Sequence, residues 1–165
     1  MKKIITRKPL VFLLFAAFGL RLLLLPLFWH QPLNIVDEQH YNKLALAILE
    51  RGEFGWAPGR PTAIRPPLYP AFLALVYKFL GAENYNAVRI IQIFLSLLSG
   101  ILVYSLAQKI FRRERISLLA SGIFLFYPSL VIFNYLILTE TLFTFLFLVS
   151  LWFLITVILA VSSTS

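Results

Sequence analysis

Long apolar runs without charged side chains constrain this chain more than any other feature. Residues 141–161 hold no Asp, Glu, Lys or Arg. About 20 apolar residues in a helix span the roughly 30 Å hydrocarbon core of a bilayer. Over the whole chain 60% of residues are hydrophobic and 13% are charged, against about 25% charged in soluble domains. The sequence therefore predicts an all-α integral membrane protein.

Four segments are predicted as transmembrane helices. They cover approximately residues 9–29, 88–111, 116–135 and 140–161, so that 1–161 form one transmembrane module and 162–165 a short tail. The basic start resembles a signal peptide. However, the first run is too long for a signal-peptide core, it contains Arg21, and no small-residue cleavage site follows. We therefore expect this segment to remain in the mature protein as its first span.

The basic residues predict the orientation of the chain. Two clusters flank apolar runs, the first with Lys2, Lys3, Arg7 and Lys8, the second with Lys109, Arg112, Arg113 and Arg115. Positive charge beside a span is typical of a cytoplasmic position and does not indicate a nucleic-acid partner. If both clusters are cytoplasmic, an even number of crossings separates them. We therefore expect a multi-pass protein of an inner or plasma membrane, with a cytoplasmic N-terminus and loop 30–87 outside.

Loop 30–87 is the polar part of the sequence and should contain two interfacial helices. The first is expected at 35–51, with Asn34 as N-cap, Asp37 as its capping partner and Gly52 at the end. The second is expected at 66–80, from the Pro66-Pro67 pair to Gly81. Its length of about 22 Å as a helix is short for a span. Both helices should lie along the membrane lipids of the outer face.

Asp37 and Glu38 are the candidate catalytic residues. They are adjacent carboxylates at the start of the predicted helix 35–51. A carboxylate partly removed from water can act as a general base toward a hydroxyl or an amine. The alternative interpretation is that both acids only stabilise the helix N-terminus, where negative charge is favoured.

Arg65 and Arg21 are the candidate residues for binding a donor phosphate. A guanidinium binds phosphate in a bidentate manner, and the Pro66-Pro67 pair restricts the backbone beside Arg65. The alternative for Arg65 is contact with lipid phosphates. Arg21 lies inside the first apolar run, where it either extends to the far interface or faces the loop and meets an anionic ligand.

Glu140, Tyr41 and His40 complete the candidate set, as residues that bind an acceptor or a metal. Glu140 starts the last span and should face the same compartment as the loop, although it could simply begin a helix. For His40, an interfacial position without a ligand is the favoured interpretation. A divalent cation is the one cofactor considered. The chain has no cysteine, and no zinc-site spacing, phosphate-binding loop or nucleophile elbow occurs.

The order of these features resembles the N-terminal part of the GT-C-fold glycosyltransferases. The resemblance rests on Asp37-Glu38-x-x-Tyr41, on Arg65-Pro66-Pro67-Leu68-Tyr69-Pro70 and on Thr139-Glu140. The nearest group is the bacterial branch of dolichyl-phosphate-mannose-protein mannosyltransferase-like enzymes, which includes the lipid A aminoarabinose transferases. The chain would then be a partial GT-C module. The resemblance implies a polyprenyl-phosphate-linked sugar donor, a protein or lipid acceptor, and inverting transfer on the outer face.

The resemblance also implies roles for single residues. Asp37 would be the base, Glu38 its partner, Arg65 the donor-phosphate contact and Glu140 the second-loop acid. Ile64 stands where relatives often carry an acid, which disfavours a metal site. The family's membrane module has seven or more spans, so we expect this chain to be a fragment. Two other functions stay open at this point, a transporter component for a lipid-linked sugar and a non-catalytic membrane scaffold.

Overall fold

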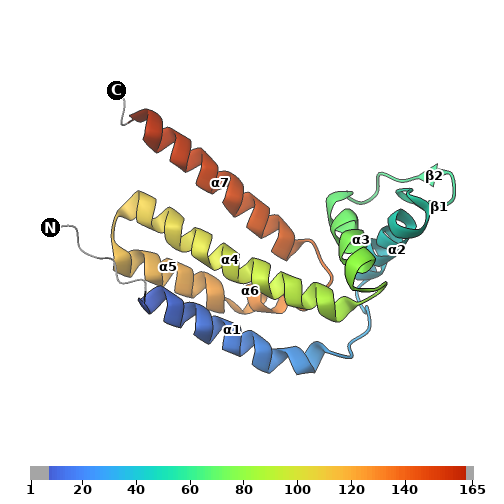
Figure 1. Ribbon diagram of the computed structural model, residues 1–165, viewed down its shortest axis with the longest axis horizontal. Helices are drawn as coiled ribbons and strands as arrows, with labels where there is room; N and C mark the ends of the chain where they lie inside the picture. The colour runs from blue at the N-terminus through green and yellow to red at the C-terminus, as the bar shows by residue number, and fades with distance from the viewer. Residues whose placement is uncertain (1–7, 163–165) are drawn as a thin grey trace.

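Three long helices form the body of the molecule. The computed structural model describes residues 8–162. Within that range α1 (Lys8–Phe28), α4 (Tyr85–Phe111) and α7 (Glu140–Ser162) are long and apolar enough to cross a membrane. Figure 1 shows the smaller elements α2 (Val36–Arg51), α3 (Leu68–Leu80) and the hairpin of β1 (Gly55–Ala57) and β2 (Arg60–Pro61) gathered beyond one end of these helices. The prediction of an all-α membrane protein is confirmed.

The segment expected as one span at 116–135 is broken into two helices. α5 (Glu114–Phe126) ends at Tyr127, and α6 (Pro128–Ile132) is a single short turn of helix. Pro128 disfavours the helical conformation of the residue before it, and Tyr127 is extended, with φ −65° and ψ 120°. The expected four long spans are therefore three long helices and a broken segment. That segment still carries the chain from the far end of α4 back toward α2 and α3 (Figure 1).

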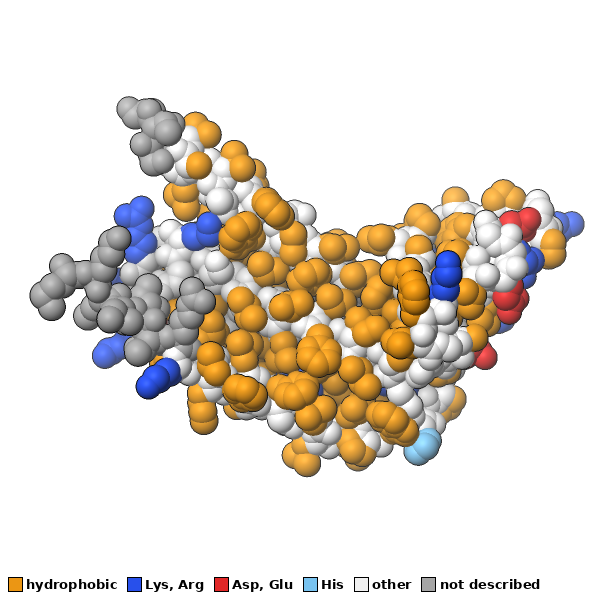
Figure 2. Space-filling view, in the orientation of Figure 1, with side chains coloured by type: hydrophobic (Ala, Val, Ile, Leu, Met, Phe, Trp, Pro, Cys, Tyr) orange, Lys and Arg blue, Asp and Glu red, His pale blue; other side chains and the backbone are white. Residues whose placement is uncertain are grey.

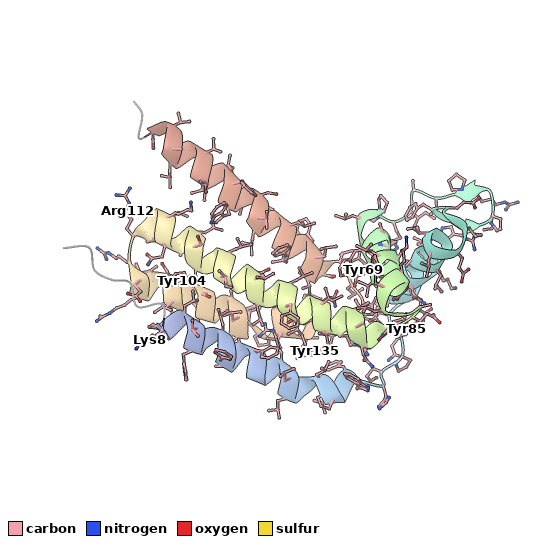
Figure 3. All side chains as sticks on the ribbon, in the orientation of Figure 1. Lys8, Tyr69, Tyr85, Tyr104, Arg112 and Tyr135 are labelled. Carbon is pink, nitrogen blue, oxygen red and sulfur yellow. The ribbon has the colours of Figure 1, made fainter. Side chains whose placement is uncertain are left out.

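The exposed charged side chains gather at the two ends of the molecule (Figure 2, Figure 3). Figure 3 places Lys8 and Arg112 at one end, and Tyr69 and Tyr85 at the other. The face shown in Figure 2 is apolar between these ends and carries almost no charge there. Three basic residues of the first cluster, Lys2, Lys3 and Arg7, lie outside the described residues. The separation fits the expected topology, while the side of the membrane on which each end lies stays a prediction.

Arg21 is buried in the helical body, with no exposed surface. Its guanidinium donates to Asn134 Oδ1 at 2.7 Å and to Ser96 Oγ at 3.1 Å. It also donates to the backbone oxygens of Leu125 and Ala17, at 3.0 and 3.1 Å. Neither interpretation offered from the sequence describes this position, because the side chain neither extends to an interface nor faces the loop. Instead Arg21 joins α1 to α4, to the end of α5 and to the turn before α7.

Two side chains of α4 donate hydrogen bonds to the backbone of the non-helical segment 133–139. Gln92 Nε2 donates to the carbonyl oxygens of Asn134 and Leu136, at 3.1 and 2.8 Å. Arg89 Nε donates to the carbonyl oxygen of Tyr135 at 2.9 Å. Backbone groups outside regular structure need such partners where water is absent. These bonds allow an irregular turn to be buried and to set the starting point of α7.

Helices α4 and α5 pack tightly against each other at Gly100. Ser121 Oγ donates to the carbonyl oxygen of Gly100 at 2.9 Å. A Cβ atom at position 100 would lie 2.5 Å from Leu125 Cδ2, and Leu125 is fully buried. Small residues at helix contacts permit this close packing in membrane proteins.

Helices α2 and α3 occupy almost the predicted segments, but the N-terminal cap of α2 differs. Ile35 is the N-cap, and Glu38 Oε2 accepts from the backbone nitrogens of Ile35 and Asn34, at 3.0 and 3.2 Å. The capping partner is therefore Glu38 and not Asp37, because a side chain at the third helical position reaches back to the cap. Gly52 ends α2 in the left-handed conformation, as predicted, and its N–H donates to Ile48.

The core of the α2–α3 end includes the turn before α7. Tyr41 and Ala45 of α2, Tyr69 and Leu73 of α3, and Ile137 of the turn belong to one cluster of buried residues. The turn before α7 therefore packs directly against α2, which carries Asp37, and against α3, which follows Arg65.

Candidate active site

Asp37 and Arg65 form an ion pair at the α2–α3 end. Asp37 lies in the first turn of α2, and Arg65 precedes Pro66-Pro67 at the start of α3. Arg65 Nη2 donates to Asp37 Oδ1, with 23% of the Arg65 side chain and 43% of the Asp37 side chain exposed. The two residues that the sequence singled out as base and phosphate ligand are thus in direct contact. They remain accessible to a ligand.

Three residues on one face of α2 surround the Arg65 guanidinium. Besides Asp37, His40 Nδ1 lies 3.1 Å from Arg65 Nη2. The guanidinium carbon lies 5.7 Å from the centre of the Tyr41 ring, a cation–π contact. Positions 37, 40 and 41 share a helix face because of their spacing of three and four residues. Arg65 Nε is buried and has no hydrogen-bond partner in the described part of the chain, so this guanidinium keeps a donor that is not yet used.

A mostly apolar pocket of about 450 Å³ lies beside the ion pair. Tyr41 and Pro66, which adjoin Arg65, form part of its wall. α7 contributes the opposite wall through residues spaced three and four apart, which form one helix face. The lining residues are Tyr41, Pro66, Leu68, Tyr69, Thr139, Leu142, Phe143, Leu146, Phe147 and Ser150.

Tyr69 connects this pocket to the buried network of α4. Its hydroxyl donates to Gln92 Oε1 at 2.9 Å. Burial raises the pKa of Tyr69 well above its ordinary value, and the neighbouring Tyr77 and Glu140 shift it in the same direction. The phenol therefore stays neutral and serves as a fixed donor, and it cannot act as a base at neutral pH.

Glu38 has a different position from Asp37. Only 3% of its surface is exposed. Its Oε1 accepts from the backbone nitrogen of Ile137 at 2.9 Å, while Oε2 caps α2. Both carboxylate oxygens are thus bonded to backbone N–H groups. These contacts give no support to the prediction that Glu38 is a catalytic partner of Asp37. Glu38 instead links α2 to the turn before α7.

Glu140 lies near this end but lines a different cavity. Its neighbour Thr139 lines the 450 Å³ pocket, whereas Glu140 itself borders a cavity of about 10 Å³ with Ser96, Ser99 and Asn134. Such a volume has room for about one water molecule. Among residues 8–162 neither Glu140 nor Arg21 bonds to Asp37 or Arg65. The structure therefore brings together Asp37, His40, Tyr41 and Arg65 from the predicted set, and leaves out Glu38, Glu140 and Arg21.

A divalent cation does not fit the residues that are brought together. Within the described range no three His, Cys, Asp or Glu side chains are grouped so that they could hold a metal ion. Asp37 and His40 both contact the cationic Arg65, which would repel a metal between them. No step is therefore assigned to a metal.

The sequence reasoning missed the polar residues of α4. Arg89, Gln92 and Ser96 are spaced three and four residues apart on one face of an apolar helix, and all three are buried. A polar stripe within a predicted span is a recognisable signal of a bundle-facing surface. That pattern could have identified the network from the sequence.

Comparison with protein families identifies the family of this chain. The family model for dolichyl-phosphate-mannose-protein mannosyltransferase matches residues 64–163. The chain belongs to this mannosyltransferase family. Arg65 and Glu140 lie within the matched segment, and Asp37 and His40 precede it. Neither a curated protein nor a solved structure matches the chain significantly.

Membership in the mannosyltransferase family confirms the resemblance found in the sequence. It supports a glycosyltransferase-like membrane protein. In general terms, the family implies a lipid-linked sugar donor and a protein acceptor.

Proposed function

We propose that the protein takes part in transferring a sugar from a polyprenyl-phosphate donor to a hydroxyl group of a protein or lipid acceptor, on the outer face of the membrane. The observation that carries the proposal is the Asp37–Arg65 pair beside an apolar pocket of about 450 Å³. A lipid phosphate needs a cation for its head group and an apolar surface for its chain. Arg65 and the face of α7 supply these two requirements.

Arg65 is suited to change partners when the donor binds. In the structure its guanidinium bonds Asp37 and His40 through Nη2, while Nε has no partner among the described residues. A phosphate with several acceptor oxygens competes with a single carboxylate for a guanidinium. Donor binding would draw Arg65 toward the phosphate and release the Asp37 carboxylate from its pair.

The released Asp37 carboxylate is the proposed general base. It takes the proton of the acceptor hydroxyl while the hydroxyl oxygen forms a bond to the anomeric carbon of the sugar. The bond between that carbon and the phosphate oxygen breaks, and the polyprenyl phosphate leaves with both electrons. Arg65 stabilises the negative charge that develops on the leaving phosphate. Attack from the side opposite the phosphate inverts the configuration of the anomeric carbon.

A transporter is less consistent with the interior of the helical body. The buried polar side chains of α1 and α4 bond each other and the backbone of the broken segment. The cavity beside Glu140, at about 10 Å³, holds about one water molecule and offers no path for a sugar.

The proposal is tested by transfer of radiolabelled mannose from polyprenyl-phosphate mannose to protein in membranes that contain the chain. Asp37→Asn should lower turnover by about 10²-fold or more, as expected for loss of a general base. Glu50→Gln is the matched control, since Glu50 is an exposed acid of the same helix. Turnover by Asp37→Asn at the rate of the unchanged chain would contradict the role of Asp37. Absence of transfer by the unchanged chain would contradict polyprenyl-phosphate mannose as the donor.

A further inference from the structure

A second pocket, of about 250 Å³, lies where the chain leaves α1 and where α4 begins. It shares no lining residue with the pocket beside Asp37 and Arg65. Trp29, with 41% of its surface exposed, forms part of its wall together with Gln31, Glu83, Asn86 and Arg89. The pocket therefore combines the aromatic side chains of Trp29 and Tyr85 with planar polar side chains.

The Glu83 carboxylate is held in a fixed orientation in this pocket. Glu83 has a φ of 57°, in the left-handed region that residues other than glycine seldom adopt. Its Oε1 accepts from Asn42 Nδ2 at 2.7 Å and from the Tyr85 hydroxyl at 2.9 Å. Asn42 is in turn fixed by the Tyr77 hydroxyl at 2.8 Å. Glu83 Oε2 receives no hydrogen bond from the residues that the structure describes, so one acceptor oxygen remains for a ligand.

The amide of Asn86 is fixed in a similar way on the other side. Arg89 Nη1 donates to Asn86 Oδ1 at 2.9 Å, which leaves the amide nitrogen of Asn86 as a donor. Arg89 is itself only 2% exposed and also donates to the carbonyl oxygens of Gln31 and Tyr135. Because Arg89 is committed to these acceptors and Glu83 carries a negative charge nearby, the pocket is poorly suited to an anion.

We propose that this pocket binds a single pyranose sugar. A pyranose presents an apolar C–H face, which can stack on the indole of Trp29. Its hydroxyl groups both donate and accept, and they match the free oxygen of Glu83 and the amide nitrogen of Asn86. A volume of about 250 Å³ lies just below the range of pockets for drug-sized ligands, which fits one ring better than a longer chain. The site goes beyond the proposed transfer reaction and uses none of its residues.

Binding is tested with the full chain in nanodiscs of uncharged lipid, by saturation-transfer NMR with methyl mannoside, methyl glucoside and methyl galactoside. We expect at least one of these glycosides to bind. Trp29→Ala should weaken that binding about tenfold, the loss of a good aromatic contact. Glu83→Gln should weaken it by at least a similar factor, since it removes a charged acceptor. Circular dichroism shows whether each variant keeps its helices.

Two controls locate the site and separate it from the reaction. Trp56 is also an exposed tryptophan at the α2–α3 end, and Trp56→Ala should leave glycoside binding unchanged. Asp37→Asn should also leave glycoside binding unchanged while it lowers transfer about 10²-fold or more, so the two proposals can fail separately. The proposal is overturned if no glycoside binds. It is equally overturned if Trp29→Ala and Glu83→Gln bind the glycoside as tightly as the unchanged chain, or if binding is lost in Trp56→Ala or Asp37→Asn.

Discussion

Glu38 Oε1 accepts a 2.9 Å hydrogen bond from the backbone nitrogen of Ile137, which joins the first turn of α2 to the turn that precedes α7. The 450 Å³ pocket lies between Tyr41 of α2 with the start of α3 on one side and a face of α7 on the other. The same carboxylate caps α2 through Oε2. One buried acid therefore fixes both the helix that carries Asp37 and the starting point of the helix that faces it.

Glu38→Ala should destabilise the fold. It leaves the Ile137 N–H and the cap of α2 without their acceptor, and each buried N–H left without a partner costs about 1–3 kcal/mol. We expect a lower midpoint of thermal unfolding in detergent. Asp37→Asn changes a partly exposed ion pair. Exposed pairs contribute about 0–1 kcal/mol, so this variant should lose less stability than Glu38→Ala. Equal losses in the two variants would contradict the structural role of Glu38.

Gly100→Ala and Gly19→Ala should have opposite effects on stability. A Cβ at position 100 would lie 2.5 Å from the buried Leu125 side chain, whereas nothing lies within 4 Å of a Cβ at position 19. Overpacking costs about 1–3 kcal/mol, and alanine in an open helix position gains up to about 1 kcal/mol over glycine. Thermal unfolding of both variants measures the difference. Recovery of stability in the double variant Gly100→Ala, Leu125→Ala would identify this contact as the cause.

Arg21→Met should destabilise the helical body more than substitutions on its lipid-facing side. The change removes donors from the carbonyl oxygen of Leu125 and from the side chains of Asn134 and Ser96. Each buried acceptor that loses its donor costs about 1–3 kcal/mol. Leu23→Ala is the control, because Leu23 is 75% exposed on the same helix. A similar fall in the unfolding midpoint for both would show that the Arg21 bonds do not hold the bundle.

The two ends of the molecule should lie on opposite sides of the membrane. The chain has no cysteine, so single cysteines report position without interference. Arg60→Cys, in the hairpin, should react with a membrane-impermeant maleimide added to intact cells. Arg113→Cys, at the opposite end, should react only after the cells are opened. Labelling of both from outside would contradict the predicted topology.

The sequence predicted those features of the fold that depend on nearby residues. The bounds of α2 and α3 follow from Gly52, Gly81 and the Pro66-Pro67 pair, which act through the local backbone. The break at Tyr127 also has a local cause in Pro128, but the apolar run across it masked that signal.

The candidate site could be predicted only in part, because its contacts join distant segments. The sequence placed Asp37 and Arg65 together in loop 30–87 as parts of one site, but it did not predict that the two side chains form an ion pair. Asp37 and Glu38 are adjacent, about 100° apart on the helix, and the sequence does not show which of the two faces the turn at Ile137. Arg21 likewise acquires its position from Asn134, which lies 113 residues away.

The most direct test of the account is the affinity of the protein for polyprenyl phosphate without a sugar, measured in nanodiscs for three forms of the full chain. In the proposed mechanism Arg65 binds the phosphate, and Asp37 competes with the phosphate for Arg65. Arg65→Gln should therefore weaken binding about tenfold or more, as expected for loss of a charged hydrogen bond. Asp37→Asn should bind at least as tightly as the unchanged protein. Unchanged affinity in Arg65→Gln, or weaker binding in Asp37→Asn, would contradict the account.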